Sequence, residues 1–150
     1  MDEKMLSRMD MQLANTEKGL EACNEFSSRY GLTLSGEDIR ELAKCRAKAL
    51  KETGRVEFGG GVLPKLIYAF CDSPYIDADD YETTLADLQD AFYYFKGEAM
   101  ERFSDDELIE YMQKVFNGVA EGSVDYLTGS SLEELCRLAK ESWKPVGGML

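Results

Sequence analysis

Residues 55–72 read RVEFGGGVLPKLIYAFCD, and this stretch decides the fold. The run LPKLIYAFCD, from Leu63 to Asp72, is apolar on almost every side and predicts a short, deeply buried helix. Pro64 suits the first turn of that helix, where a backbone N–H lacks an intrahelical partner in any case. The three glycines Gly59–Gly61 predict a tight turn in which the backbone closely approaches its neighbours.

Helical periodicity extends on both sides of this stretch. Apolar or small residues recur at steps of three and four from Leu6 to Tyr30, and Gly31 is expected to end that helix. Further helices are predicted over residues 35–54, from about residue 79 to 99, over 104–118 and over 131–143. Three of them begin with a capping serine, followed three residues later by an acidic residue: Ser35, Ser104 and Ser131. The sequence therefore predicts an all-α bundle of about six helices.

Two short alternating stretches, Arg55–Phe58 and Ser123–Leu127, are each compatible with one strand, which would add a short two-stranded pairing. The chain has 150 residues and shows no internal repeat or linker, so it predicts a single domain over residues 1–150. The segment from about residue 144 is expected to be a loose C-terminal tail.

Composition excludes several classes of function. The net charge is −12, which predicts a soluble protein that repels nucleic acid and anionic membranes. The N-terminus MDEKMLSRMD lacks the apolar core of a secretory signal, and no apolar run approaches the roughly 20 residues that span a bilayer. The four cysteines are scattered and form no CxxC pair, so we expect reduced thiols in a cytoplasmic protein.

No catalytic, metal or cofactor site is predicted. The sequence has no histidine, which removes the commonest general base and the commonest zinc ligand. The acidic run from Asp77 to Glu82 fails as a calcium loop, because Tyr81, Glu82 and Leu88 stand at its fifth, sixth and twelfth positions. These carboxylates are instead expected to favour the N-terminal dipole of the helix that follows.

Arg46 falls in the middle of the apolar face of the helix over residues 35–54. One interpretation is structural: the side chain pairs with an acidic residue such as Glu57, or reaches solvent along its stem. The other is a site for a small anion, since free amides before a helix can bind one. That site would comprise Arg46, Arg55, Gly59, Gly60, Gly61 and Lys65.

Charge is distributed unevenly, which points to interaction surfaces. No basic residue occurs between Lys65 and Lys96, whereas acidic residues and tyrosines are frequent there. The candidate interface residues are Asp77, Asp79, Asp80, Tyr93 and Tyr94. A basic stripe on the helix over residues 35–54 is interpreted as a solvated face, or as a surface that docks to the acidic half of another copy: Arg40, Lys44, Lys48 and Lys51.

The stretches LTLSGEDI, GRVEFGGGVLPKLIYAFCDSPYI, LADLQDAFYYF and SDDELIEYM together resemble a family of small, uncharacterised bacterial cytoplasmic proteins, a domain of unknown function. The resemblance covers roughly Gly31 to Leu127. It implies a bacterial, mostly helical, single-domain protein, and it implies no activity, substrate or cofactor.

From the sequence we therefore expect a non-enzymatic interaction or adaptor protein with an acidic surface, which docks another protein or a second copy of itself. The alternative is a protein that binds a small anionic ligand or phosphometabolite through Arg46 and Gly59–Gly61. An enzyme built on tyrosine, lysine, arginine and carboxylates, and a mimic of the charge spacing of DNA, are further hypotheses.

Overall fold

Helix α3 (Val62–Phe70) forms from the apolar run that decides the fold. It is seen in a computed structural model that describes residues 3–55, 57, 61–99 and 102–142, with side chains described from residue 14 to residue 137. Pro64 lies in its first turn as predicted. Its core-facing residues are all at most 1% exposed: Val62, Leu63, Leu66, Ile67 and Phe70. The helix is not buried on every side, however, because Tyr68 is 52% exposed.

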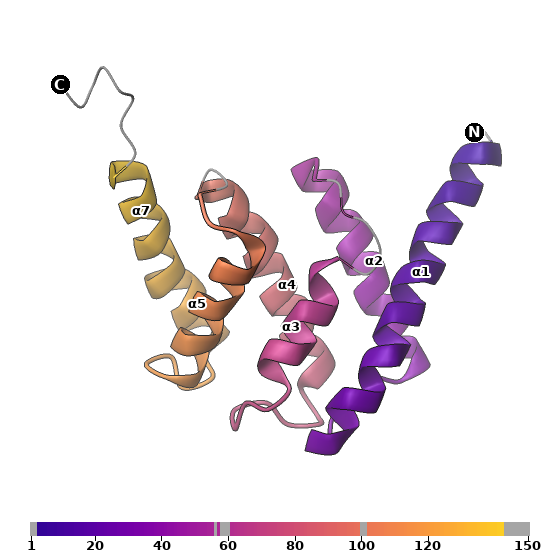
Figure 1. The fold of residues 1–150 in the computed structure, drawn as a ribbon, viewed down its shortest axis with the longest axis horizontal. Coiled ribbons are helices and arrows are strands. Elements are labelled where there is room, and N and C mark those ends of the chain that lie inside the picture. The colour runs from indigo at the N-terminus through magenta and orange to yellow at the C-terminus, as the bar shows by residue number, and fades with distance from the viewer. Residues whose placement is uncertain (1–2, 56, 58–60, 100–101, 143–150) are drawn as a thin grey trace.

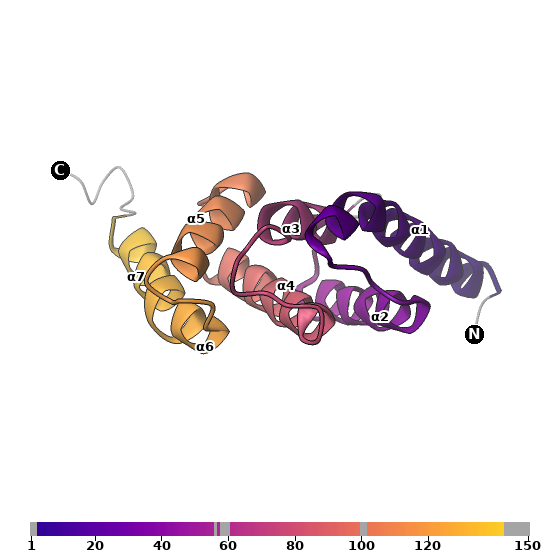
Figure 2. The same ribbon diagram turned by 90° about the horizontal axis from the view of Figure 1, so that it is seen from below.

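The described ranges contain six helical segments and no strand, so the predicted all-α bundle is confirmed. Successive segments run in alternate directions, and they form two layers, with α1, α3 and α5 in one layer and α2, α4 and α6 in the other (Figures 1 and 2). The bounds are α1 Glu3–Ser27 with the 3-10 turn η1 Ser28–Tyr30, α2 Gly36–Thr53, α4 Tyr81–Glu98, α5 Asp105–Asn117, α6 Val124–Tyr126, the π-helical turn η2 Leu127–Leu132, and α7 Glu133–Ser142.

Three of the predicted helix boundaries follow from local hydrogen bonding. The hydroxyls of Ser35 and Ser104 accept the backbone N–H of the third residue of α2 and α5, and the side chains of Asp38 and Glu107 bond back to the serine amides. Gly31 has φ +78°, the left-handed conformation that ends a helix and that glycine adopts without strain.

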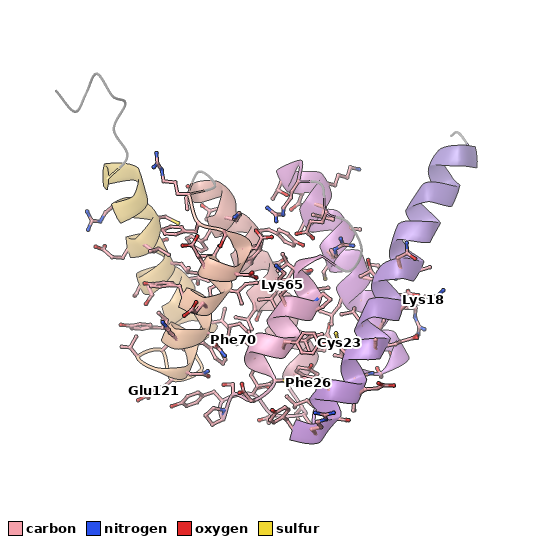
Figure 3. All side chains as sticks on the ribbon, in the orientation of Figure 1. Lys18, Cys23, Phe26, Lys65, Phe70 and Glu121 are labelled. Carbon is pink, nitrogen blue, oxygen red and sulfur yellow. The ribbon has the colours of Figure 1, made fainter. Side chains whose placement is uncertain are left out.

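One continuous apolar core joins the two layers. The apolar residues that recur at steps of three and four along α4 and its C-cap are all buried: Tyr81, Leu85, Leu88, Phe92, Phe95 and Ala99. On α1, Cys23 is buried and points toward α3, whereas Lys18 points away from the body (Figure 3). Tyr30, which the sequence pattern from Leu6 onward placed on the apolar face of the first helix, is instead 49% exposed at the end of η1.

The last helical segment differs from the prediction. It begins after Ser123, whose hydroxyl accepts the N–H of Tyr126 at 3.1 Å, so the predicted strand over Ser123–Leu127 is wrong. Ser131, predicted to cap a helix, lies within η2 and has no N-terminus to cap. In η2 the backbone is wound more widely than in an α-helix, and Leu127 and Leu132, five residues apart, are both 0% exposed.

Two predictions cannot be compared with the fold. Half of the candidate strand Arg55–Phe58, namely residues 56 and 58, and the C-terminal tail from residue 144 lie outside the described residues. Among the helices that are described, none is both long enough and apolar enough to cross a bilayer.

Replacing the capping serine of the last segment should distinguish the observed helix start from the one predicted by periodicity. Ser123→Ala removes a hydrogen bond to a helix N-terminus and should lower the free energy of unfolding by about 1 kcal/mol. Ser131→Ala, inside the segment, should change it by less than about 0.5 kcal/mol. Urea denaturation followed by circular dichroism measures both, and an equal or larger loss for Ser131→Ala would contradict the assignment.

Candidate functional site

Arg46 lies inside the protein, as its place on the apolar face of α2 predicted. It is 5% exposed, and its Nη1 donates to Oγ1 of Thr16 on α1 at 2.6 Å. Its Nε donates to Oε1 of Glu57 at 3.3 Å. The structural interpretation of Arg46, pairing with Glu57, is thereby confirmed.

The carboxylate of Glu57 is shared by three side chains. Oε1, which receives Arg46, also accepts the hydroxyl of Tyr93 on α4 at 2.6 Å. Oε2 accepts Nε of Arg55 at 2.9 Å. The Glu57 side chain is only 5% exposed, so nearly all of its charge is balanced by protein groups rather than by water.

From Arg55 the network continues to α5. Nη2 of Arg55 donates to Oδ2 of Asp105 at 2.7 Å, and Nζ of Lys96 lies 3.1 Å from Oδ1 of the same carboxylate. Lys96 also donates to the carbonyl oxygen of Phe103. We call the connected side chains the buried charge network: Thr16, Arg46, Arg55, Glu57, Tyr93, Lys96 and Asp105.

The pKa values of Arg55, Asp105 and Tyr93 in this network are shifted by their neighbours. Burial works against the charged forms of Arg55 and Asp105. The hydrogen bonds and opposite charges outweigh it, so the pKa of Arg55 is raised and that of Asp105 is lowered. Burial and the neighbouring Glu57 carboxylate raise the pKa of Tyr93, which keeps its hydroxyl protonated as a donor.

Gly61 shows what occupies the space in front of α3. It has φ +66°, and a methyl group added to it would overlap Oε1 of Glu57 and lie 2.8 Å from Nη2 of Arg46. The Glu57 carboxylate therefore lies against Gly61 and the side chains of Arg46 and Arg55. An external anion would have to compete with Glu57 for these cations.

The other residues of the predicted anion site do not all converge there. Lys65 is about half exposed and pairs with Asp106 on α5 at 2.9 Å. Gly59 and Gly60 lie outside the described residues. The structure thus brings Arg46, Arg55 and Gly61 together, around a carboxylate that belongs to the protein.

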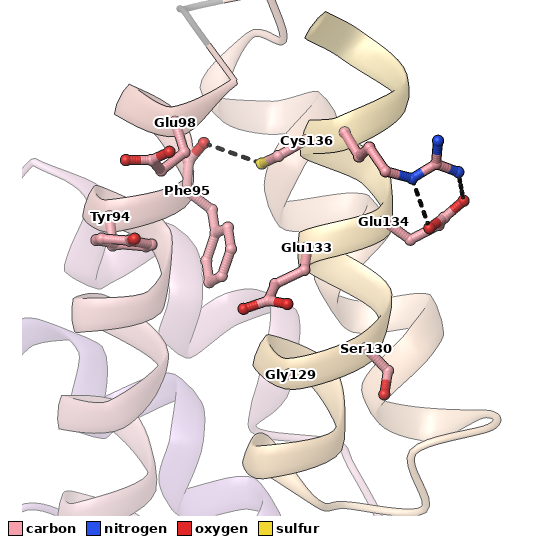
Figure 4. A pocket seen from close by; sticks show the side chains of 9 residues that line it. Tyr94, Phe95, Glu98, Gly129, Ser130, Glu133, Glu134 and Cys136 are labelled. Atoms are coloured by element: carbon pink, nitrogen blue, oxygen red, sulfur yellow. Dashed lines mark hydrogen bonds and ion pairs between the residues drawn. The ribbon is translucent and has the colours of Figure 1, made fainter. Parts of the chain in front are cut away.

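A separate hollow lies between α4 and the last helical segment. Its volume is about 480 Å³, and Phe95 and Glu133 face each other across it (Figure 4). Cys136, which donates through Sγ to the carbonyl oxygen of Phe95, lines the same wall as Arg137, and Arg137 is paired with Glu134. The full lining is Tyr94, Phe95, Glu98, Gly129, Ser130, Glu133, Glu134, Cys136 and Arg137.

A second hollow of about 340 Å³ adjoins the first, because Tyr94 and Phe95 line both. Three carboxylates border it, from Asp87 and Asp90 on α4 and from Asp125 on α6. We call the two hollows together the acidic groove. In the part of the chain that the structure describes, none of these three carboxylates forms an ion pair.

Two carboxylates of the acidic groove have raised pKa values. Partial burial raises the pKa of Asp87, and the charge of Asp125 raises it further. Burial likewise raises the pKa of Asp90, the charges of Asp87 and Glu52 raise it further, and the charge of Lys48 on α2 lowers it. A cation placed in the groove would relieve this repulsion.

The groove does not have the geometry of a metal centre. Across the described ranges, no three cysteine or carboxylate side chains are grouped closely enough to hold a metal ion. The four cysteines all lie among the described residues and form no disulfide. Burial raises the pKa of the Cys23, Cys45 and Cys71 thiols.

A comparison with known protein families matches residues 19–145 to a family of unknown function, DUF6323. The chain belongs to DUF6323. The match confirms the resemblance to a domain of unknown function and extends beyond the Gly31–Leu127 range at both ends. A search of curated proteins and a search of solved structures found no match.

The predicted interface residues of this DUF6323 protein differ in their exposure to solvent. Tyr94 is 59% exposed, as expected of an interface residue, but Tyr93 is 3% exposed inside the buried charge network and is not available to a partner. Asp77 and Asp80 accept backbone N–H bonds within the turn before α4, and Asp79 is exposed beside them.

Sequence reasoning missed a second buried stripe on α4. Gln89, Tyr93 and Lys96 follow one another at steps of four and three and are all at most 6% exposed. Their spacing is that of one helix face, but a search for recurring apolar residues does not detect it because these side chains are polar. The acidic groove was also missed, since it depends on α4 and α6 being neighbours.

Replacing Gly61 should test how tightly the buried charge network fills the space before α3. Gly61→Ala combines a strained positive φ with a collision at Glu57 and Arg46, and should cost roughly 2–5 kcal/mol of unfolding free energy. Gly54→Ala is the matched control, because Gly54 also has positive φ, +70°, but has open space around it. It should cost about 1 kcal/mol. Equal losses in urea denaturation would contradict the close packing.

Neutralising Glu57 should leave two arginines without their shared carboxylate. We expect Glu57→Gln to lower the unfolding free energy by roughly 3–5 kcal/mol, the usual cost of breaking a buried ion pair. Glu52→Gln removes a carboxylate that pairs with Lys48 at 3.9 Å on the exposed surface. It should change stability by less than about 1 kcal/mol. Thermal and urea denaturation compare the two, and a stable Glu57→Gln variant would refute the role given to Glu57.

Proposed function

We propose that this protein is a non-enzymatic interaction protein whose acidic groove binds a basic segment of a partner. The observation that carries the proposal is the contrast between two sets of carboxylates. Glu57 and Asp105 each have cationic partners, whereas the groove carboxylates Asp87, Asp90 and Asp125 have no ion pair among the described residues.

The groove combines charge with an exposed aromatic ring. Tyr94 lines both hollows, and tyrosine is enriched among the residues that dominate binding energy at protein interfaces. Lysine or arginine side chains of a partner would reach Asp87, Asp90 and Asp125 while an apolar side chain packs on Tyr94 and Phe95. Charge complementarity of this kind steers association and selects the partner.

The wall opposite α4 supports the same proposal. Gly129 and Ser130 of the π-helical turn η2 line the larger hollow. Short π-helical turns cost stability relative to a regular α-helix and are frequent at functional sites. A wide turn that borders the groove is consistent with a surface shaped for binding.

The proposal includes a cytoplasmic location and a bacterial origin. The four cysteines, all among the described residues, form no disulfide, which suits a reducing compartment, and the bacterial origin is what the sequence resemblance implies. Binding of a small anion is less well supported, since Arg46 and Arg55 already contact the Glu57 carboxylate.

Binding of a basic helix tests the proposal. The probe is a fluorescent amphipathic peptide of leucine and lysine, with a glutamate-for-lysine version as the negative probe. We expect Asp87→Asn/Asp90→Asn/Asp125→Asn to weaken binding at least tenfold, about 1.4 kcal/mol, measured by fluorescence anisotropy. Tyr94→Ala should weaken it as well.

The matched control changes the same number of charges on another surface. Glu17→Gln/Glu21→Gln/Glu25→Gln alters α1, which lies in the other layer, and should leave the affinity within about twofold. Equal losses in both triple variants would show attraction to net charge only. No binding of the lysine peptide by the unmodified protein in its monomeric form would reject the groove as a binding site.

A further inference from the structure

A basic stripe runs along the exposed side of α2. Arg40, Lys44, Lys48 and Lys51 are all exposed and follow one another at steps of four, four and three. Lys44 and Lys48 contact Glu41 and Glu52 at 3.7 and 3.9 Å, with all four side chains more than half exposed. Such surface ion pairs contribute little to stability, so Lys44 and Lys48 can leave them and pair with another molecule at a small cost in free energy.

The basic stripe and the acidic groove lie on the same surface of the molecule. Helices α2 and α4 pack side by side in one layer, and α6 follows α4 in that layer (Figure 2). The charges of Glu52 and Lys48 on α2 act on the pKa of Asp90, which borders the groove. This layer therefore presents a basic edge at α2 and an acidic edge at α4 and α6.

A surface with a basic and an acidic edge is complementary to itself after a half-turn. Two copies placed face to face about a two-fold axis bring each basic edge against the partner's acidic edge, which makes both contacts at once. Ala47, exposed on α2 between Lys44 and Lys48, and the exposed ring of Tyr94 would each add an apolar position to such a contact.

We infer that the occupant of the acidic groove is helix α2 of a second copy, in a two-fold dimer in which each copy supplies one stripe and one groove. This inference rests on the proposed function, because it names the partner of the same groove. The net charge of −12 on each copy opposes association over long distances. At physiological salt that repulsion is screened beyond about 8 Å, whereas the contacting charges act at a few ångströms.

Charge exchange between two variants tests the dimer. The unmodified chain should sediment with twice its mass of 16.9 kDa at tens of micromolar. Asp87→Lys/Asp90→Lys/Asp125→Lys makes the groove basic, and Arg40→Glu/Lys44→Glu/Lys48→Glu makes the stripe acidic. Each variant alone juxtaposes like charges and should be monomeric, with its dimer dissociation constant raised at least tenfold. An equimolar mixture should restore a dimer that contains one copy of each.

Each other outcome overturns the inference. Variants that remain dimeric would place the contact elsewhere, a mixture that stays monomeric would exclude the pairing of stripe with groove, and larger assemblies would exclude the two-fold axis. An unmodified chain that is monomeric yet binds the lysine peptide would reject the dimer and leave the proposed function standing. Circular dichroism checks that the variants fold. If lysine is not tolerated in the groove, Asp87→Asn/Asp90→Asn/Asp125→Asn replaces that variant, and a dimer dissociation constant that it leaves unchanged would overturn the inference.

Discussion

The buried carboxylate of Glu57 is the constraint on which the rest of the structure depends. It neutralises Arg46 and Arg55 and accepts the Tyr93 hydroxyl, so the segment before α3 is held to α2 and α4 at one point. A buried ion pair adds little net stability relative to apolar packing, but leaving one of its charges unpaired is costly. We therefore interpret the network chiefly as a device that specifies which helices pack together and in what register.

The same chemistry has opposite outcomes in two parts of the molecule. Inside, the carboxylates of Glu57 and Asp105 lie within 3.3 Å of arginine or lysine nitrogens. In the acidic groove, burial and the charge of Asp125 on α6 raise the pKa of Asp87 on α4 instead. The core satisfies its charges internally, and the groove leaves its charges to be satisfied by something else. That difference connects the fold to the proposed interaction.

The sequence predicted most helices because their apolar periodicity is uninterrupted, and it failed where the period changes. Leu127 and Leu132 share a buried face only because η2 is wound more widely than an α-helix, so a search at 3.6 residues per turn placed the helix start at Ser131. The pairing of Arg46 with Glu57 could be predicted from the sequence, since an inward arginine requires a carboxylate. The burial of Tyr93 could not be predicted. Helix α4 is covered by neighbours on more than one side, so the one apolar stripe seen in the sequence underestimates its buried surface.

The alternating, two-layered path of the chain affects which helices unfold locally. Each helix packs mainly on elements near it in sequence, while α1 and α7 lie at opposite ends of the stack (Figure 1). In a stack of this kind each helix is stabilised by the helices next to it, so a helix at either end has neighbours on one side only. Amide hydrogens near the ends should exchange with solvent through local fraying, whereas those of α2 and α4, clamped by the buried charges, exchange only when the whole molecule unfolds.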